Sequence, residues 1–279
     1  MTWCAVDVRT PAAEREAVVA WLVERTGQAV EERADGVLVG ATESAGAPAL
    51  LADLSAAFGA RVAGAARVLP EVDWRLRWRD GLAARRVGRL LITPSWIPAA
   101  APESAPALVP VIIDPETAFG TAEHGSTRTA LALLEQLLSP GDRMLDLGSG
   151  SGILAIAAAR LGAARAVGVD CDPEVEAVAL ANAGRNGVAE RVRFLTGDAG
   201  ELAPLLGPAE VVASNILRSV NQALLPAIRA ALTPTGVAIF AGIEHAERTA
   251  FLATLERERW SVIREANDDG WWSAAARPR

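Results

Sequence analysis

The second half of the chain contains three glycines and three polar residues whose types and spacing could form a ligand-binding or catalytic site. The stretch MLDLGSGSG places Gly148, Gly150 and Gly152 directly after an apolar run with the length of a buried strand. Such a turn lets a ligand approach the backbone closely, and the helix that follows offers free N–H groups and a positive dipole end. The turn predicts a bound ligand, with a tight strand-to-helix connection as the alternative.

The position of Asp170 narrows the class of ligand. It ends the next predicted strand, AVGVD, 22 positions after Gly148. An acid at about this interval after a glycine-rich turn is placed to accept hydrogen bonds from ribose hydroxyls. A dinucleotide motif would need glycine or alanine where Ile153 stands, and a P-loop would need lysine, which the chain lacks. We therefore expect a ligand with one nucleoside.

Two further polar residues follow later predicted strands. Asp198, in TGD, is placed to receive an adenine amino group, or alternatively to cap a helix. Asn215, in SNIL, ends the fourth strand of the series, where a buried amide is costly unless it is hydrogen-bonded. We interpret Asn215 as functional, with a structural hydrogen bond as the alternative.

Strands that alternate with helices of ten to fifteen residues from Arg143 onward predict an α/β domain with a mostly parallel sheet covered on both faces. Ligands bind such sheets at the carboxyl ends of the strands, where all of these candidates stand. Before it, residues 1–72 read as strand, helix, strand, helix, strand, which predicts a small α+β domain. Residues 73–110 read as a linker helix with Trp74 and Trp78, followed by a connection rich in proline and alanine. The second domain is expected over 111–279.

Composition and charge exclude several classes of protein. A net charge of −7 argues against a broad surface for nucleic acid, because phosphate contacts need clustered cations. The sequence shows no membrane span and no secretory signal, so a cytoplasmic protein is expected. Cys4 and Cys171 are too few for a disulfide framework, and His124 and His245 have no ligands at metal spacing, so no metal is expected.

The motif series resembles a known family of enzymes. LDLGSGSG, VGVDCDP, TGD and SNIL are similar to the motifs of class I methyltransferases, which use S-adenosylmethionine. The segment DPETAFGTAEHGSTRTALALLEQL resembles the signature of PrmA-type ribosomal protein methyltransferases, which act on protein eleven of the large ribosomal subunit. The resemblance covers residues 73–279 well. It implies a Rossmann-like domain with a seven-stranded sheet, preceded by a ferredoxin-like domain that holds the ribosomal protein.

The resemblance also implies a set of site residues. Expected cofactor contacts are Thr127, Gly148, Gly150, Asp170, Asp198 and Asn215, together with Phe119 and Thr121 from a loop that the family folds across the cofactor. Two positions depart from the family pattern. Ala122 replaces a glycine, which restricts the loop if the position needs positive φ, and Gly125 replaces a proline.

The expected reaction is methyl transfer to lysine or N-terminal amines, with Asn215 as the catalytic residue. Its side-chain oxygen can accept a hydrogen bond from the neutral amine and aim the amine's lone pair. No general base is assigned, and His124 is a candidate for that role. The alternatives are a methyltransferase for a small molecule or nucleic acid, a non-catalytic binding module and an NAD-dependent oxidoreductase. The N-P-P-[YF] motif common in nitrogen methyltransferases is absent. A monomer is expected.

Overall fold

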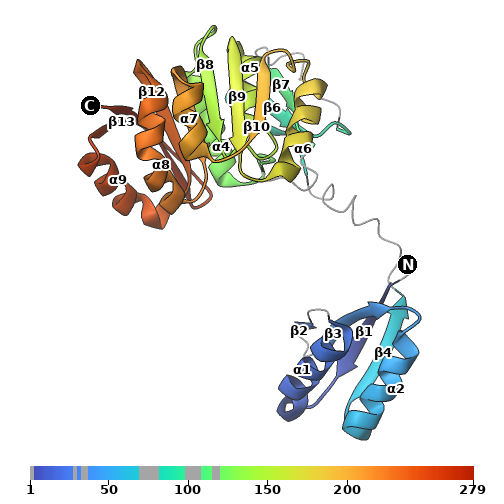
Figure 1. Ribbon diagram of the computed structural model, residues 1–279. Coiled ribbons are helices and arrows are strands. Elements are labelled where there is room, and N and C mark those ends of the chain that lie inside the picture. Colours follow the sequence, from blue (N-terminus) through green and yellow to red (C-terminus); the bar gives the residue numbers. More distant parts are fainter. Residues whose placement is uncertain (1–2, 28–29, 33–36, 69–81, 98–107, 115–119) are drawn as a thin grey trace. The chain divides into compact units, whose positions relative to one another are not determined.

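The chain folds into two compact units, Met1–Asp80 and Gly81–Arg279. The structure is a computed structural model, and it describes residues 3–27, 30–32, 37–68, 82–97, 108–114 and 120–279 (Figure 1). Phe119, Trp74 and Trp78 lie outside the described residues, as does most of the expected linker helix. No helix in the described ranges is both long and apolar enough to cross a membrane.

The first unit is a four-stranded antiparallel sheet with two helices. The elements are β1 (Trp3–Arg9), α1 (Arg15–Thr26), β2 (Glu31–Glu32), β3 (Val37–Glu43), α2 (Ala47–Phe58) and β4 (Ala63–Val68). The strands are ordered β2-β3-β1-β4. Helix α1 ends where Gly27 adopts a φ of 65°. The core joins β1 and β3 to both helices through Val6, Leu38, Leu22 and Leu54. The element order β–α–β–β–α–β is that of the ferredoxin-like motif.

Part of the expected linker is folded into the second unit. β5 (Arg85–Val87) and β6 (Leu90–Thr93) form a hairpin, and β6 pairs in parallel with β7 (Val109–Ile112). Val87, Leu90 and Ile92 belong to a hydrophobic cluster that reaches into the main sheet. The second unit therefore starts before residue 111. The hairpin forms because Gly88 turns the chain between the two strands with a φ of 57°.

The second unit contains a seven-stranded sheet ordered β10-β9-β8-β11-β12-β14-β13. Its strands are β8 (Arg143–Leu147), β9 (Arg165–Asp170), β10 (Val192–Thr196), β11 (Ala209–Asn215), β12 (Leu232–Glu244), β13 (Trp260–Asp268) and β14 (Trp271–Pro278). Neighbours from β10 to β12 pair in parallel, whereas β14 is antiparallel to both β12 and β13. The expected α/β domain with a mostly parallel seven-stranded sheet is confirmed.

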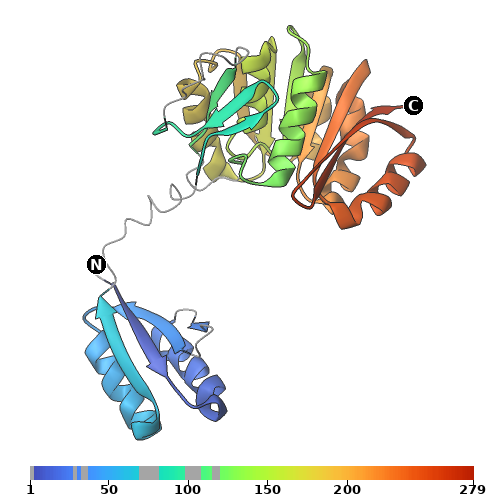
Figure 2. The same ribbon diagram turned by 180° about the vertical axis from the view of Figure 1, so that it is seen from behind.

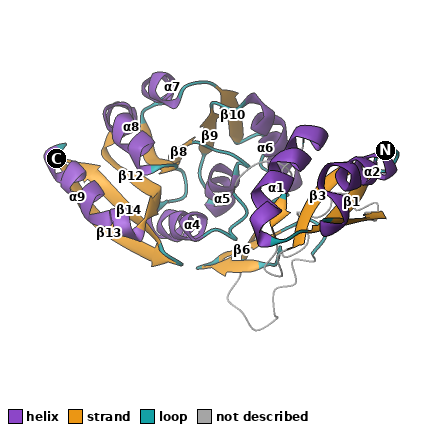
Figure 3. Cartoon of the chain, turned by 90° about the horizontal axis from the view of Figure 1, so that it is seen from below, coloured by secondary structure: helices purple, strands orange, loops and turns teal. Residues whose placement is uncertain are grey.

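Three helices cover each face of this sheet. On one face lie α4 (Gly125–Leu137), α5 (Ile153–Leu161) and α6 (Pro173–Arg185), and Figure 2 shows α4 in green on the near side. On the other lie α7 (Ala199–Leu206), α8 (Arg218–Ala231) and α9 (Arg248–Arg257). Figure 3 shows α7 and α8 on the side of the sheet opposite α4 and α5. Separate hydrophobic clusters fill the two sides, so the sheet is buried on both faces and its carboxyl edge stays free for a ligand.

Candidate functional site

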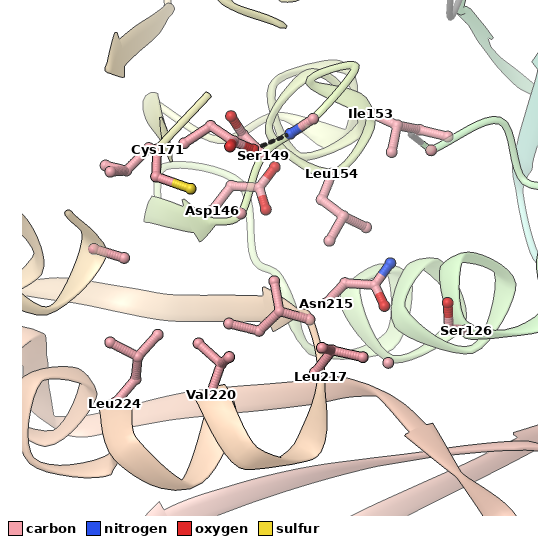
Figure 4. A pocket seen from close by; sticks show the side chains of 18 of the residues that line it. Ser126, Asp146, Ser149, Ile153, Leu154, Cys171, Asn215, Leu217, Val220 and Leu224 are labelled. Atoms are coloured by element: carbon pink, nitrogen blue, oxygen red, sulfur yellow. Dashed lines mark hydrogen bonds between the residues drawn. The ribbon is translucent and has the colours of Figure 1, made fainter. Parts of the chain in front are cut away.

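A cavity of about 610 Å³ opens at the carboxyl ends of β8, β9 and β11 (Figure 4). This volume lies within the range of roughly 300–1,000 Å³ that is common for small-molecule sites. The lining is mainly apolar, with a few polar groups from different elements. The residues that line it are Gly120, His124, Ser126, Asp146, Gly148, Ser149, Gly150, Ile153, Leu154, Val169, Asp170, Cys171, Gly197, Asp198, Ala199, Asn215, Ile216, Leu217, Val220, Leu224, Gly242 and Trp271.

The glycine-rich turn is the part of the wall where side chains are excluded. Gly148, Gly150 and Gly152 have φ values of 76°, 47° and 80°, which glycine adopts without steric cost. A Cβ atom on Gly148 would lie 2.4 Å from Cγ2 of Ile216. The backbone at Gly148 and Gly150 therefore forms part of the cavity wall.

Two of the predicted acids lie along the same wall. Asp170 Oδ2 accepts a hydrogen bond of 2.8 Å from the Gly150 N–H, and its Oδ1 accepts one of 3.1 Å from the Asp172 N–H. Each carboxylate oxygen keeps a second lone pair for a ligand. Asp198 caps α7 by accepting from the Glu201 N–H at 3.0 Å, so the helix-cap alternative is realised. Asp198 also lines the cavity.

Asn215 lies at the end of β11 with its amide partly paired. Its Nδ2 donates to Oγ1 of Thr127 at 3.3 Å, which fixes the orientation of the amide. Its Oδ1 is buried and has no hydrogen-bond partner in the part of the chain that the structure describes. Such an unsatisfied acceptor costs about 1–3 kcal/mol in the folded chain. Thr127 itself is buried and does not line the cavity, so its contribution is to orient Asn215.

The remaining loop residue that the sequence predicts lies elsewhere. Thr121 lines a small separate cavity near Ile92 and Pro94, and its Oγ1 accepts from the Glu123 N–H at 3.3 Å. Next to it, Ala122 has a φ of 63°, so the position does require the left-handed conformation that favours glycine. The departure from the family pattern at this residue therefore leaves a strained turn.

The cavity wall also contains Trp271 and Asp146, which the sequence motifs did not identify as site residues. Trp271 follows the turn between β13 and β14, where Asp269 and Gly270 have φ values of 47° and 78°. The Asp-Gly dipeptide between two strands signals such a hairpin and could have located Trp271. Its ring lies 4.3 Å from that of His124, centroid to centroid. The other residue, Asp146, stands inside the glycine motif itself, and an acid within an apolar run was its signal.

His124 is held in the cavity wall as a neutral group. Its Nδ1 lies 2.6 Å from Oγ of Ser126, and its ring packs against Trp271. Burial lowers the pKa of His124 below its ordinary value, and the charge of Arg128 lowers the pKa further. A neutral imidazole in this place adds no positive charge to the cavity.

Asp146 is the most buried acid of the site. Its Oδ2 accepts from the Ala155 N–H at 3.1 Å, whereas its Oδ1 is buried without a partner among the described residues. Burial raises the pKa of Asp146 to about 7, and the nearby charge of Asp170 acts in the same direction. This acid therefore titrates near neutral pH, at the floor of the cavity.

We predict that Asp146→Asn stabilises the fold increasingly as pH rises. Because the folded chain holds a proton that the unfolded chain has released, this group makes the free energy of unfolding of the wild type fall between about pH 4 and about pH 7. The slope is at most about 1.4 kcal/mol per pH unit. Asparagine cannot ionise, so the stability gained by the variant should grow over that window.

Urea unfolding at about pH 5 and about pH 7.5 measures this difference. The matched control is Glu190→Gln at an exposed acid, which should show no such growth. A stability difference between Asp146→Asn and wild type that is the same at both pH values would contradict the raised pKa.

Comparison with known proteins identifies relatives of the whole second unit and part of the first. Residues 50–278 match the family model described as ribosomal protein L11 methyltransferase (PrmA). The chain is 39% identical to the ribosomal protein L11 methyltransferase of Pelotomaculum thermopropionicum over 75% of its own length and 67% of the relative. It is 34% identical to that of Deinococcus radiodurans, over 91% and 89% of the two chains. For several relatives, the chain thus spans about two thirds of their length.

A solved structure shares the fold. The crystal structure of a ribosomal protein L11 methylase from Lactobacillus delbrueckii subsp. bulgaricus superposes with a TM-score of 0.62 at 26% identity. The match covers 69% of this chain and 96% of the other. With the sheet order, the glycine turn and the family match in agreement, the chain belongs to the PrmA family of ribosomal protein L11 methyltransferases, within the class I S-adenosylmethionine-dependent methyltransferases.

Proposed function

We propose that this protein transfers methyl groups from S-adenosylmethionine to lysine side-chain or N-terminal amines of ribosomal protein L11. The observation that carries the proposal is Asn215 at the carboxyl end of β11, whose buried Oδ1 has no partner in the described part of the chain. The proposal is further supported by membership of the family, whose named members methylate L11. The same fold acting on another protein, a small molecule or a nucleic acid nitrogen remains the competing function.

The residues present fit S-adenosylmethionine. The turn presents bare backbone at Gly148, where a side chain would clash with Ile216, and this leaves room for a nucleoside and an amino acid. Asp170 keeps lone pairs for ribose hydroxyls, and Asp198 stands beside it for the adenine end. When bound, the cofactor would supply an electrophilic methyl group on a sulfonium, with a neutral thioether as the leaving group, and this transfer to an amine nitrogen needs no metal.

The chain's own part in the reaction is to position and desolvate the amine. Oδ1 of Asn215 can accept a hydrogen bond from the amine N–H, and the bond to Thr127 holds Oδ1 in that orientation. A lysine amine must lose its proton first, and an apolar cavity lowers the pKa of an ammonium group by desolvation. Preorganised positioning of this kind supplies much of the rate in displacement reactions.

We further propose that the first unit, residues 1–80, recruits the ribosomal protein. It has its own hydrophobic cluster, and the cavity is lined by residues of the second unit alone. A division of labour follows, with recognition in the first unit and chemistry in the second. We also propose that the protein acts as a monomer in the cytoplasm without binding nucleic acid, in keeping with its net charge of −7.

We predict that Asn215→Ala lowers the rate of L11 methylation by about 100-fold or more, because the acceptor amine loses the group that orients it. The rate is measured with purified L11 and labelled S-adenosylmethionine. Asn267→Ala, on β13 and outside the cavity lining, is the matched control. Full activity of a folded Asn215→Ala variant would refute the catalytic role.

We predict that removal of residues 1–80 abolishes methylation of L11 and leaves the affinity for S-adenosylmethionine unchanged. The second unit keeps both of its hydrophobic clusters and every residue that lines the cavity. Calorimetry measures the affinity, and mass spectrometry of L11 measures methylation. Continued methylation of L11 by the shortened chain would rule out the recruiting role.

A further inference from the structure

The turn at Ala122 is held in a conformation that its residue type disfavours. Its φ is 63°, and the residue is fully buried. The left-handed conformation costs a residue other than glycine roughly 1–2 kcal/mol. Contacts elsewhere in the chain must therefore hold the turn in place.

Arg128, one helical turn into α4, supplies these contacts. Its Nη1 donates to the backbone carbonyl of Ala122 at 3.2 Å and to that of Glu123. Its Nε donates to the carboxylate of Asp268, and 19% of the Arg128 side chain is exposed. We call this set of four residues, Ala122, Glu123, Arg128 and Asp268, the Arg128 clamp. It joins a loop, a helix and a strand in one network of charge-assisted hydrogen bonds.

The clamp fixes the hairpin between β13 and β14 against the start of α4. Asp268 is the last residue of β13, and Trp271 is the first residue of β14. The contact leaves no room for a side chain at Gly125, where a Cβ atom would lie 2.5 Å from the Asp268 carbonyl oxygen and 2.9 Å from Cδ1 of Trp271. Trp271 is thereby brought against His124.

The residues placed by the clamp lie at one end of the cavity. His124, Ser126 and Trp271 all line it, and Figure 4 shows Ser126 on the side of Asn215, with Cys171 on the opposite side. Asp170 and Asp198, the acids assigned to the nucleoside, bond to Gly150, Asp172 and Glu201, none of which belongs to the clamp. A disturbance of the clamp should therefore reach the acceptor amine and spare the cofactor.

We propose that Arg128 is a positioning residue for the acceptor amine, which it serves by holding His124 and Trp271 together as one wall of the cavity. The expected effect of Arg128 on the rate rests on the proposed methylation of L11. Its structural part, the dependence of Trp271 on Arg128, stands independently of the substrate. Arginine is needed because a lysine has no planar fork to reach two carbonyl groups and a carboxylate at once.

The test compares Arg128→Gln with Arg143→Gln. Arg143 is the first residue of β8, at the end of the strand away from the cavity, and its substitution breaks an exposed ion pair with Glu210 of β11. For Arg128→Gln we expect kcat/KM for L11 to fall by about tenfold or more, with the Kd for S-adenosylmethionine within about twofold of wild type. Arg128→Lys should restore activity only in part. Ala122→Gly added to Arg128→Gln should recover part of the loss, because glycine adopts the turn without strain.

The indole N–H resonance of Trp271, assigned with Trp271→Phe, provides a readout that needs no substrate. It should shift in Arg128→Gln and stay unchanged in Arg143→Gln. If the wild type fails to methylate L11, the proposed function fails, while this resonance still tests the clamp. An unmoved Trp271 resonance, an unchanged kcat/KM, or an equal loss of cofactor and acceptor affinity would each overturn the proposal.

Discussion

The hydrogen bond between the Asp170 carboxylate and the Gly150 N–H is the contact on which the rest of the site depends. It joins the ends of two neighbouring parallel strands, β8 and β9, at 2.8 Å. Gly150 takes its φ of 47° without strain because glycine has no Cβ atom. Gly150 and Asp170 both line the cavity, so one contact shapes the fold and the proposed nucleoside site.

The two ends of the cavity are built differently. The nucleoside end consists of backbone and short acids that directly follow strands, and its shape is set by local turns. The acceptor end is assembled from α4 and from the hairpin of β13 and β14, which are distant in sequence. Thr129 and Ser273 join these elements by a hydrogen bond of 2.6 Å between their hydroxyl groups. Differences in acceptor choice can therefore arise at this end while the cofactor site is preserved.

Two residues of the cavity wall bury polar atoms that are not hydrogen-bonded. Asn215 and Asp146 each keep one buried oxygen without a partner among the residues that the structure describes, and this adds a cost to the folded chain. Both atoms belong to residues that line the cavity. Native proteins retain few such groups, and the packing around the cavity must offset their cost.

The features that the sequence could predict are those fixed by local chemistry. Gly148, Asp170 and Asn215 follow strands, so parallel-sheet geometry alone brings them to one edge. The Asp-Gly dipeptide could locate the hairpin that carries Trp271, but the contact of Trp271 with His124 and the position of Thr121 at a separate small cavity depend on tertiary packing. The concern that position 122 needs positive φ was predictable from its glycine in the family, and the structure confirms it.

The hairpin of β5 and β6 was missed for a related reason. Its strands are short, and the proline-rich stretch around them reads as a connection, whereas Leu90 and Ile92 are buried by contacts with distant elements. Local pattern does not reveal such burial. The division of the chain near residue 80 likewise emerges from packing and not from composition.

The most direct test of the account is to incubate the intact protein with labelled S-adenosylmethionine and a complete set of large-subunit ribosomal proteins together with ribosomal RNA. Mass spectrometry then locates every methyl group. The account predicts label on amines of L11, at lysine side chains or the N-terminus, and none on the RNA. Label confined to RNA or to another protein, with L11 unmodified, would contradict it.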